Sequence, residues 1–287
     1  MPLVAAVAAS HAPNILLEPG VEWEDFMDLH FSMAPQGTSS RPTFEQQQKL
    51  RRDAEEAFGI LRAELQRANP NVLIVVANDQ FVNFFNNVIP TFFVTLADEV
   101  KGQFTRHKFH YKNHKALGRA ILDAGIEKGF DLAFGDHIEL QHTQTVPLYF
   151  LLREPTIPIL PIYVNTWMDP IPTPRRCYQL GELIRAVADA SSERVAILAT
   201  GGLSHYPGTS RVGEIDTEFD HKLLQTLREG RGRALADYTK EQLWQAGDSE
   251  FLNWIVALGA VGDAKASSTF YLPDLVATGW GFVSWKL

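Results

Sequence analysis

The sequence predicts a single α/β domain over residues 1–287, built on a central, mostly parallel or mixed sheet with helices on both faces. Short, continuous apolar runs flanked by turn-forming residues recur along the chain, which is typical of strands buried on both faces of a sheet. Long amphipathic stretches with helical spacing alternate with these runs, and this alternation is the pattern of βαβ units with parallel pairing. No change in composition marks a second domain.

The first half of the chain begins with an apolar run at 3–9, which we expect to be a buried strand. The segment 18–43 is rich in glycine, proline and serine but also holds several large apolar side chains. We therefore expect an ordered loop there, a lid packed over the sheet edge. A long helix is predicted over 43–68, with its first residue, a threonine, as the N-cap. A second buried strand is predicted at 72–77.

The second half continues the alternation. Helices are predicted over 113–129, a short segment ending at 151, 174–190 and, in two pieces, 214–235. Strands are predicted over 93–96, 131–134, 157–164, 194–200 and, as shorter pieces, 270–287. The prolines of 157–164 favour an edge strand or an irregular start. A last helix is expected to run to residue 260, with Asp248 or Ser249 as its cap.

Composition and charge exclude several classes of protein. The net charge is −8, from 26 basic and 34 acidic residues, and the basic residues are scattered rather than gathered on a nucleic-acid-binding face. A single cysteine, Cys177, excludes an internal disulfide framework and a cysteine-based zinc cluster. No apolar run approaches the ~20 residues that a membrane span needs, and the first residues lack the basic start of a signal peptide. We expect a cytoplasmic protein with neither nucleic acid nor membrane as partner.

Side chains that carry chemistry follow several of the predicted strands. His11, Gln80 and His205 come directly after the strongest strands, and His142 follows a weaker one. Because parallel strands end at the same edge of a sheet, these groups are expected to converge, with Glu250 joining them from a helix start. Two imidazoles, or equivalents, and one carboxylate form the facial arrangement that binds ferrous iron. Taken singly, each residue also has an ordinary structural interpretation, as a polar strand end or a solvated helix start.

Other motifs are weaker. His107, His110 and His114 lie close together, but lysines and an arginine surround them, so a solvated face is favoured over a metal cluster. The segment 200–205 lacks a nucleophile elbow, which argues against a serine hydrolase. The glycines form neither a dinucleotide fingerprint nor a P-loop.

Five blocks occur in the order of one known family and span nearly the whole chain. They are Ser-His-Ala-Pro at 10–13, Asn-Asp-Gln-Phe-Val-Asn-Phe-Phe at 78–85, His-Thr-Gln-Thr-Val-Pro-Leu at 142–148, Thr-Gly-Gly-Leu-Ser-His at 200–205 and Glu-Phe-Leu-Asn-Trp-Ile-Val at 250–256. With these blocks the chain resembles the class III extradiol ring-cleavage dioxygenases. This family includes the catalytic subunit of protocatechuate 4,5-dioxygenase and gallate dioxygenases.

The resemblance implies roles for four residues. His11 and Glu250 would be ligands of a non-haem Fe(II) ion, His205 would be the acid/base, and His142 would lie near the dioxygen and substrate oxygens. The implied reaction is extradiol (meta) cleavage of a catechol-type aromatic ring with O2. The implied assembly is a homo-oligomer, or a hetero-oligomer with a small subunit.

Gln80 is a departure from the family pattern, which has a second histidine ligand at this position. Three interpretations are open. Gln80 ligates the metal through its amide oxygen, although an amide is a poorer donor to Fe(II) than imidazole; or another histidine, such as His30, takes its place; or the chain is a non-catalytic or regulatory homologue paired with an active dioxygenase. A working enzyme is favoured, because His11, His142, His205 and Glu250 are all present.

Overall fold

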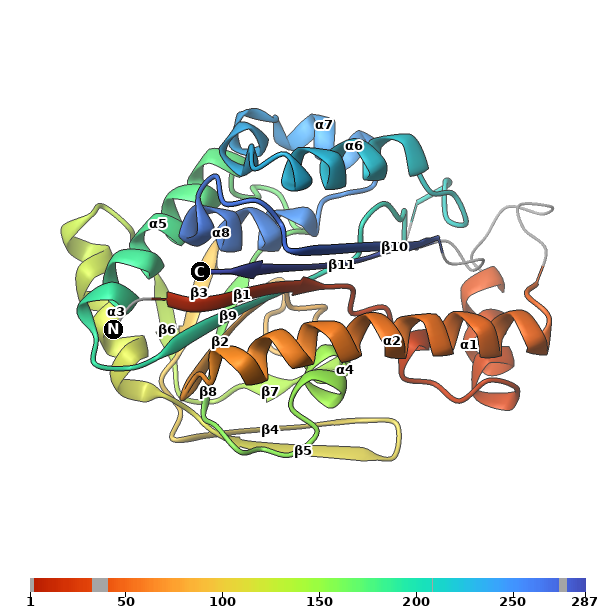
Figure 1. Cartoon of the computed structure of the whole chain (residues 1–287), viewed down its shortest axis with the longest axis horizontal. Helices are drawn as coiled ribbons and strands as arrows, with labels where there is room; N and C mark the ends of the chain where they lie inside the picture. Colours follow the sequence, from red (N-terminus) through yellow and green to blue (C-terminus); the bar gives the residue numbers. More distant parts are fainter. Residues whose placement is uncertain (1–2, 33–40, 208, 274–277) are drawn as a thin grey trace.

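The computed structural model describes residues 3–32, 41–207, 209–273 and 278–287. Within these ranges a mixed sheet of eight strands runs through the molecule, and helices cover both of its faces, which confirms the predicted fold class (Figure 1). In spatial order the strands are β10 (Ser268–Pro273), β11 (Gly279–Lys286), β1 (Leu3–Ala9), β9 (Val195–Thr200), β2 (Val72–Ala77), β8 (Ile159–Val164), β3 (Phe92–Thr95) and β6 (Ala133–Gly135).

The centre of the sheet consists of four parallel strands, β1, β9, β2 and β8. Their side chains are nearly all buried because each strand is covered on both faces, which explains their continuous apolar sequences. In register, Ala9 of β1 lies opposite Thr200 of β9, and Ala77 of β2 lies opposite Tyr163 of β8. The residues that follow these strands therefore meet at one edge of the sheet.

Two hydrophobic cores lie on the two faces of the sheet. One core is formed with α1 (Val21–Ser32), α2 (Phe44–Ala68) and α4 (His142–Leu151), and the other with α3 (Lys115–Glu127), α5 (Pro174–Ala190), α6 (Thr217–Arg228) and α8 (Phe251–Val261). Short segments complete the fold: α7 (Lys240–Gln245) and the 3₁₀ turns η1 (Pro13–Ile15) and η2 (Gly232–Asp237).

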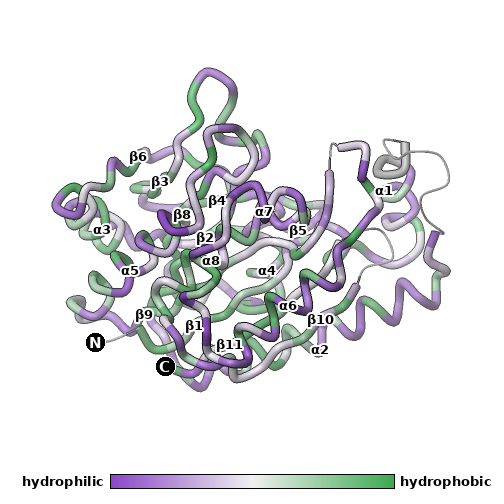
Figure 2. Tube along the Cα trace, turned by 90° about the horizontal axis from the view of Figure 1, so that it is seen from above, coloured by the Kyte–Doolittle hydropathy of each residue, from purple (hydrophilic) through white to green (hydrophobic). Residues whose placement is uncertain are grey.

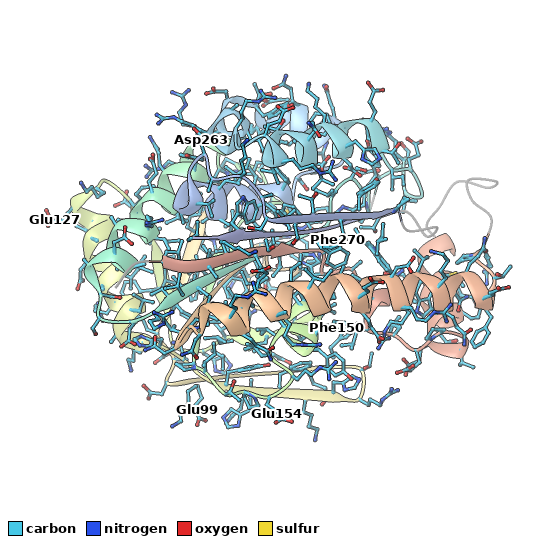
Figure 3. The ribbon with its side chains drawn as sticks, viewed as in Figure 1. Glu99, Glu127, Phe150, Glu154, Asp263 and Phe270 are labelled. Carbon is cyan, nitrogen blue, oxygen red and sulfur yellow. The ribbon has the colours of Figure 1, made fainter. Side chains whose placement is uncertain are left out.

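The polarity of the elements follows this layering. Hydrophilic and hydrophobic residues alternate along α2 and α6, which each bury one side only (Figure 2). Every residue of α8, by contrast, is buried. Acidic side chains such as Glu127, Glu154 and Asp263 lie at the periphery, whereas Phe150 of α4 lies inside, stacked on Phe58 of α2 with ring centroids 4.6 Å apart (Figure 3).

The long predicted helix and its cap are confirmed. The Thr43 side chain accepts a hydrogen bond from the backbone N–H of Gln46, and the Gln46 side chain accepts one from the Thr43 N–H. This reciprocal pair is a capping box, which satisfies backbone donors that a helix start would otherwise leave unpaired. The strands predicted at 3–9 and 72–77 and the helix at 174–190 are also present.

The loop predicted over 18–43 is wrong for its first part, because Val21–Ser32 forms α1. Helical spacing places Trp23 and Met27 on one face, where both are buried, and Glu22 and Glu24 favour the helix start. Residues 33–40 of the predicted lid lie outside the described residues. Its function as a lid stays a prediction.

Of the two alternatives predicted for 157–164, the edge position is wrong, since β8 lies between β2 and β3, while the strand itself begins only at Ile159, after Pro158. Pro161 is tolerated there because the antiparallel pairing with β3 starts only at Ile162. On the other side, Pro161 lies in register with Val75 of β2. The missing N–H of this proline therefore removes no bond of the β3–β8 ladder.

A second, three-stranded sheet was not predicted. It consists of β5 (His107–Lys112), β4 (Glu99–Phe104) and β7 (Glu139–Leu140). The turn between β4 and β5 has Thr105 at φ +51° and contains no glycine, so it lacks the usual sequence signal of a hairpin. In the predicted solvated face, His110 is exposed and lies 2.9 Å from Glu99, while His107 and His114 are half-buried.

The start of α8 differs from the predicted cap. Its N-cap residue is Glu250, which makes no side-chain capping bond, and the Phe251 N–H instead bonds the backbone carbonyl of Asp248. The carboxylate of Glu250 is thereby left free to face the sheet edge. Neither the Asp248 nor the Ser249 side chain takes the capping role that the sequence predicted.

Helices α5 and α8 cross at unusually close range. A Cβ atom added to Gly259 would lie 1.9 Å from the backbone oxygen of Tyr178, and one added to Gly181 would lie 1.9 Å from the oxygen of Val256. Only glycine permits this approach. The crossing holds α8 against the sheet and so sets the position of its first turn. Among the residues described, none of the helices combines the length and the apolar character that crossing a bilayer requires.

Candidate metal centre

The predicted site residues converge at the carboxyl edge of the sheet. His11 follows β1, Gln80 follows β2, and His205 follows β9, while Glu250 stands at the start of α8. One Glu250 carboxylate oxygen lies 3.0 Å from His11 Nε2 and 3.5 Å from His205 Nε2. The other lies 3.1 Å from Gln80 Nε2. These four residues span 239 positions of sequence, so only the sheet topology brings them together.

Glu250 is the centre of this group. It is fully buried, and its carboxylate accepts hydrogen bonds from the Asn78 side chain at 3.0 Å and from the Gly202 N–H at 3.1 Å, besides those from Gln80 and His11. Burial raises the pKa of this carboxyl, but the neighbouring His11 and His205 outweigh burial, and the pKa lies below its ordinary value. Glu250 is therefore a buried carboxylate that carries its charge.

Two asparagines hold Glu250 in place, and the sequence analysis did not single them out. The Asn253 side-chain amide donates to Asn78 Oδ1 at 3.1 Å and to the Thr200 carbonyl at 2.9 Å. This fixes the Asn78 amide so that its Nδ2 group donates to Glu250. A signal was present: Asn253 lies three residues after Glu250, on the same side of the helix.

His11 is buried and held at both ring nitrogens. Its Nδ1 lies 3.1 Å from the Thr200 hydroxyl, and its Nε2 faces Glu250. Metal-binding histidines are typically held in this way, with the nitrogen that does not bind the metal fixed by a polar neighbour. The first strand thus delivers an imidazole whose Nε2 is already oriented.

His205 is held in one tautomer. Its Nδ1 lies 3.0 Å from the Leu203 carbonyl oxygen, which can only accept, so Nδ1 carries the proton. The other nitrogen, Nε2, faces the Glu250 carboxylate at 3.5 Å; it carries a proton in the charged ring and is bare in the neutral ring. Trp167 packs edge-on against the ring, with centroids 6.1 Å apart. A bare, oriented imidazole nitrogen is suited to accepting and returning a proton near neutral pH.

His142 lies beside His11 and opens α4. The two rings are 5.6 Å apart in an edge-on arrangement, and Phe104 lies 5.9 Å away on another side. Burial, with a contribution from His11, lowers the pKa of His142 to about 3. The ring is therefore neutral at physiological pH and has both an N–H donor and a bare nitrogen.

Gln80 is anchored by its neighbours. Its backbone N–H donates to the Gln141 side chain at 3.1 Å, and its side chain donates to Glu250. The preceding Asp79 carboxylate accepts the backbone N–H groups of residues 82–84 and so shapes the loop. The amide of Gln80 thus stands where the sequence resemblance implies an imidazole.

The donor set fits a divalent cation with one imidazole, one carboxylate and one amide oxygen. Within the described residues, no three His, Cys, Asp or Glu side chains surround a common point that could hold a metal ion. His11 and Glu250 meet directly, and Gln80 would complete a third position through its amide oxygen if the amide turned. The side chain of His30, the other predicted candidate, lies outside the described residues. An amide oxygen binds first-row transition metals less tightly than imidazole does.

The fold and the site define an α/β protein whose sheet edge gathers histidines around one buried carboxylate. Residues 30–282 match the family model described as the catalytic LigB subunit of aromatic ring-opening dioxygenase, and the chain belongs to this family. The resemblance drawn from the five sequence blocks is thereby confirmed.

Three relatives illustrate the similarity. A 2,3-dihydroxyphenylpropionate/2,3-dihydroxicinnamic acid 1,2-dioxygenase of Pseudomonas putida is 29% identical over 193 residues, covering 67% of this chain and 60% of the relative. The enzyme of that name from Klebsiella pneumoniae (strain 342) is 28% identical over 67% of this chain and 60% of its own length. The one from Photorhabdus laumondii is 26% identical over 59% and 54%. The matches thus span less than two thirds of these relatives.

A solved structure shares the fold over almost the whole chain. It is the uncharacterized protein JW3007 from Escherichia coli K12, with a TM-score of 0.55 and 13% sequence identity, covering 98% of this chain and 99% of that one. At this level of identity the match concerns the fold alone.

Proposed function

We propose that this protein is an extradiol dioxygenase that cleaves the ring of a catechol-type aromatic with O2, using Fe(II). The observation that carries the proposal is the convergence of His11, His205 and Gln80 on the buried carboxylate of Glu250. The family membership and the names of the relatives support the same reaction class.

His11, Glu250 and Gln80 would hold the iron. When bound there, Fe(II) would supply Lewis-acid activation of the two catechol oxygens and electron density for O2. Thr200 keeps the His11 ring oriented, and Asn78 keeps the Glu250 carboxylate oriented. The carbon–carbon bond beside the diol is cleaved, and both atoms of O2 enter the product.

His205 would move the protons of this reaction. Its Nδ1–H is committed to the Leu203 carbonyl, so Nε2 accepts the proton of a substrate hydroxyl and later returns it to oxygen. His142 stays neutral because burial lowers its pKa to about 3. Its N–H can therefore donate to a substrate or dioxygen oxygen without adding a positive charge.

Oxygen consumption tests the activity. The protein is purified and loaded with Fe(II) without oxygen, then mixed with aerated catechol, protocatechuate, gallate or 2,3-dihydroxyphenylpropionate. We expect O2 uptake matched by a yellow ring-opened product. Absence of both iron binding and turnover across the panel would contradict the proposed enzymatic activity and favour a regulatory homologue. In that case, copurification with a partner that has histidine at the Gln80 position would identify the active subunit.

A substitution tests the role of His205. In His205→Ala we expect turnover to fall by about 10²–10⁴-fold, the usual contribution of a general acid/base, while bound iron stays at the wild-type level. Metal content is measured in the same preparation. Loss of the iron from this variant would instead make His205 a ligand.

The setting of the activity is also a proposal. Cys177 is free and buried, which supports a reducing compartment, the cytoplasm. The loop after β2 exposes four apolar side chains, Phe81, Val82, Phe85 and Val88, which supports a homo-oligomer or a hetero-oligomer with a small subunit. The segment 18–43 would serve as a lid.

A further inference from the structure

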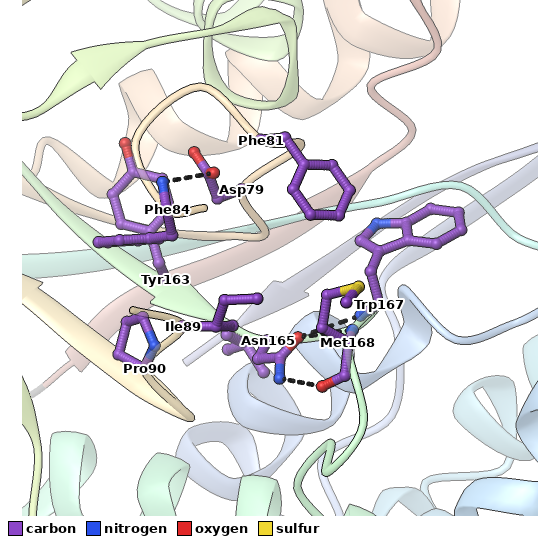
Figure 4. Close-up of a pocket in the computed structure, with 10 residues that line it drawn as sticks. Asp79, Phe81, Phe84, Ile89, Pro90, Tyr163, Asn165, Trp167 and Met168 are labelled. Carbon is purple, nitrogen blue, oxygen red and sulfur yellow. Dashed lines mark hydrogen bonds between the residues drawn. The ribbon is translucent and has the colours of Figure 1, made fainter. Parts of the chain in front are cut away.

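A pocket lies beside the metal centre, between the carboxyl ends of β2 and β8 (Figure 4). Its walls come from the loop after β2 and from the end of β8 with the turn that follows. Most of its lining is aromatic or aliphatic: Phe81, Phe84, Ile89, Tyr163, Trp167 and Met168.

This pocket shares two walls with the metal centre. Asp79, which lines it, directly precedes Gln80, whose side chain bonds Glu250. Trp167, which also lines it, packs edge-on against His205. A ring held between Gln80 and His205 would therefore have its substituents next to this pocket.

The pocket is narrow. Its space outside the atoms, counted out to the mouth, is about 330 Å³, but only about 20 Å³ is open to the centre of a water molecule. That is room for a group of about one or two heavy atoms without movement of the walls. A three-carbon acid chain would have to extend through the mouth of the pocket or move its walls.

The charge of the pocket disfavours anions. None of its described lining residues is a lysine, arginine or histidine, and the charged one among them is Asp79. The Asp79 carboxylate accepts backbone N–H groups and the Gln141 amide, at 2.6 Å, but meets no cation among these partners. A carboxylate entering beside it would lose its hydration and face a like charge.

Two hydrogen-bond donors in the pocket wall have no partner among the described residues. They are the indole N–H of Trp167 and the hydroxyl of Tyr163, and both atoms are buried. Buried donors without partners are rare in folded proteins because they cost about 1–3 kcal/mol each. Both atoms are closed to solvent, so a substituent that enters the pocket without moving its walls meets the rings of these side chains rather than the donors.

We propose that this pocket binds a small, uncharged substituent of the catechol ring, so that the protein selects methyl- or methoxy-substituted catechols over those with a carboxylate. The proposal rests on the proposed function for the position of the ring, and on the size, charge and apolar lining of the pocket for the choice of substituent.

The first test compares matched pairs of catechols. The Fe(II)-loaded protein is assayed with 3-methylcatechol against 2,3-dihydroxybenzoate, and with 4-methylcatechol against protocatechuate. We expect kcat/KM to favour the methyl compound about tenfold or more in at least one pair. A preference for the carboxylate in both pairs would overturn the proposal.

A charge placed in the pocket provides the second test. Ile89→Arg adds a cation to the lining and is expected to lower the methyl-to-carboxylate ratio about tenfold. Val88→Arg is the matched control, because Val88 is the neighbouring residue, is 64% exposed and does not line the pocket; its ratio should match the wild type. Met168→Lys repeats the test from the opposite wall in case Ile89→Arg does not fold. Equal ratios in all variants would refute the pocket as the selecting site.

Binding separates this proposal from the proposed function. The dissociation constants of the same four catechols are measured without oxygen by calorimetry on the Fe(II)-loaded protein. A methyl preference without O2 consumption on later exposure to air would contradict the dioxygenase and retain the pocket. Turnover without a methyl preference would support the dioxygenase and contradict the proposed role of the pocket. Failure of all four catechols to bind would also contradict that role.

Discussion

Gln80 places an amide where the sequence resemblance implies an imidazole, and its surroundings show how the chain accommodates it. The amide donates to Glu250, and the backbone N–H is held by Gln141. An amide can present either its N–H₂ or its oxygen by a half-turn about its last bond. Gln80 can thus donate a hydrogen bond to the Glu250 carboxylate or present its oxygen to a cation. An imidazole fixed at this position would change between these two roles less readily.

Gln80→His tests this account. An imidazole is the better donor to Fe(II), so we expect the dissociation constant for Fe(II) to fall about tenfold or more. Anaerobic metal titration measures it, and Gln80→Ala should shift it in the opposite direction. An unchanged affinity in both variants would show that the side chain at position 80 does not contact the metal.

Asn253 supports the site from one turn into α8. In Asn253→Ala, the Thr200 carbonyl and Asn78 Oδ1 lose their shared donor inside the protein. We expect a loss of about 2 kcal/mol in the free energy of unfolding, measured by urea denaturation. Asn87→Ala, at an exposed position of the loop after β2, should change it by less than about 0.5 kcal/mol. Similar values for the two variants would mean that the buried network contributes little.

The residues that meet at the sheet edge could be predicted from the sequence, but the residues that hold them in place could not. His11, Gln80 and His205 each stand directly after a recognisable strand, and parallel strands end together. Asn78 and Asn253 meet across 175 positions of sequence, and although Asn253 shares a side of the helix with Glu250, its contact with Asn78 leaves no local pattern. Trp167 was missed for a similar reason, because the turn after β8 has no periodicity that would orient its indole.

Among the secondary structure elements, α5 and α8 depend most on single residues. Gly181 and Gly259 allow the two backbones to approach, and α8 carries Glu250 in its N-cap. Any side chain at the crossing would have to push α8 away from α5 and shift the carboxylate at its start. The position of the Glu250 carboxylate therefore depends on a helix crossing that contains none of the candidate metal ligands.

Gly259→Ala is expected to lower the free energy of unfolding by about 3 kcal/mol, because the added methyl group meets backbone atoms that cannot move aside. Gly59→Ala is the matched control in α2, where the nearest atom to the new Cβ is the end of Arg62 at 3.9 Å. That variant should gain about 0.5–1 kcal/mol, since alanine is the better helix former. Chemical denaturation measures the free energy of unfolding of both variants. A small loss at Gly259 would show that the helices can separate at little cost.

Elements with strong local signals were predictable, and those held by distant contacts were not. The helix α2 has both a helical period and a capping box, so its start was located from sequence. In contrast, the glycines and prolines that flank α1 predict a loop there, and the β4–β5 hairpin turns at Thr105 without glycine. Burial of Trp23 and Met27 against the sheet stabilises α1, and that burial depends on tertiary packing.

At the scale of the whole molecule, the centre joins three strands and one helix, so metal binding is coupled to global stability. A cation that binds only the folded chain stabilises it by about 2.7 kcal/mol at one hundred times its dissociation constant. We expect anaerobic Fe(II) to raise Tm by roughly 5–10 °C and a chelator to reverse the change. Scanning calorimetry measures both, with Glu250→Gln as the control that should not respond. No shift in the wild type would mean that the edge holds no iron.

The fold class followed from sequence because buried parallel strands and intervening helices leave strong periodic signals. The strand order did not follow. Neighbouring strands such as β1 and β11 lie at opposite ends of the sequence. On the other side of the sheet, β3 pairs antiparallel with β8, so the strand direction reverses there. The order and direction of the strands depend on which surfaces fit together, and local sequence patterns do not indicate this.

The pairing of β1 has a consequence for synthesis on the ribosome. This strand is made well before its two neighbours, β9 and β11, which begin at Val195 and Gly279. Until residue 200 has left the ribosome, the apolar stretch from Leu3 to Ala9 has both of its backbone edges unpaired, a condition that invites association with other chains. A nascent chain stalled before β9 should therefore need a chaperone, and the imidazole of His11 meets its partner Thr200 only after β9 has emerged.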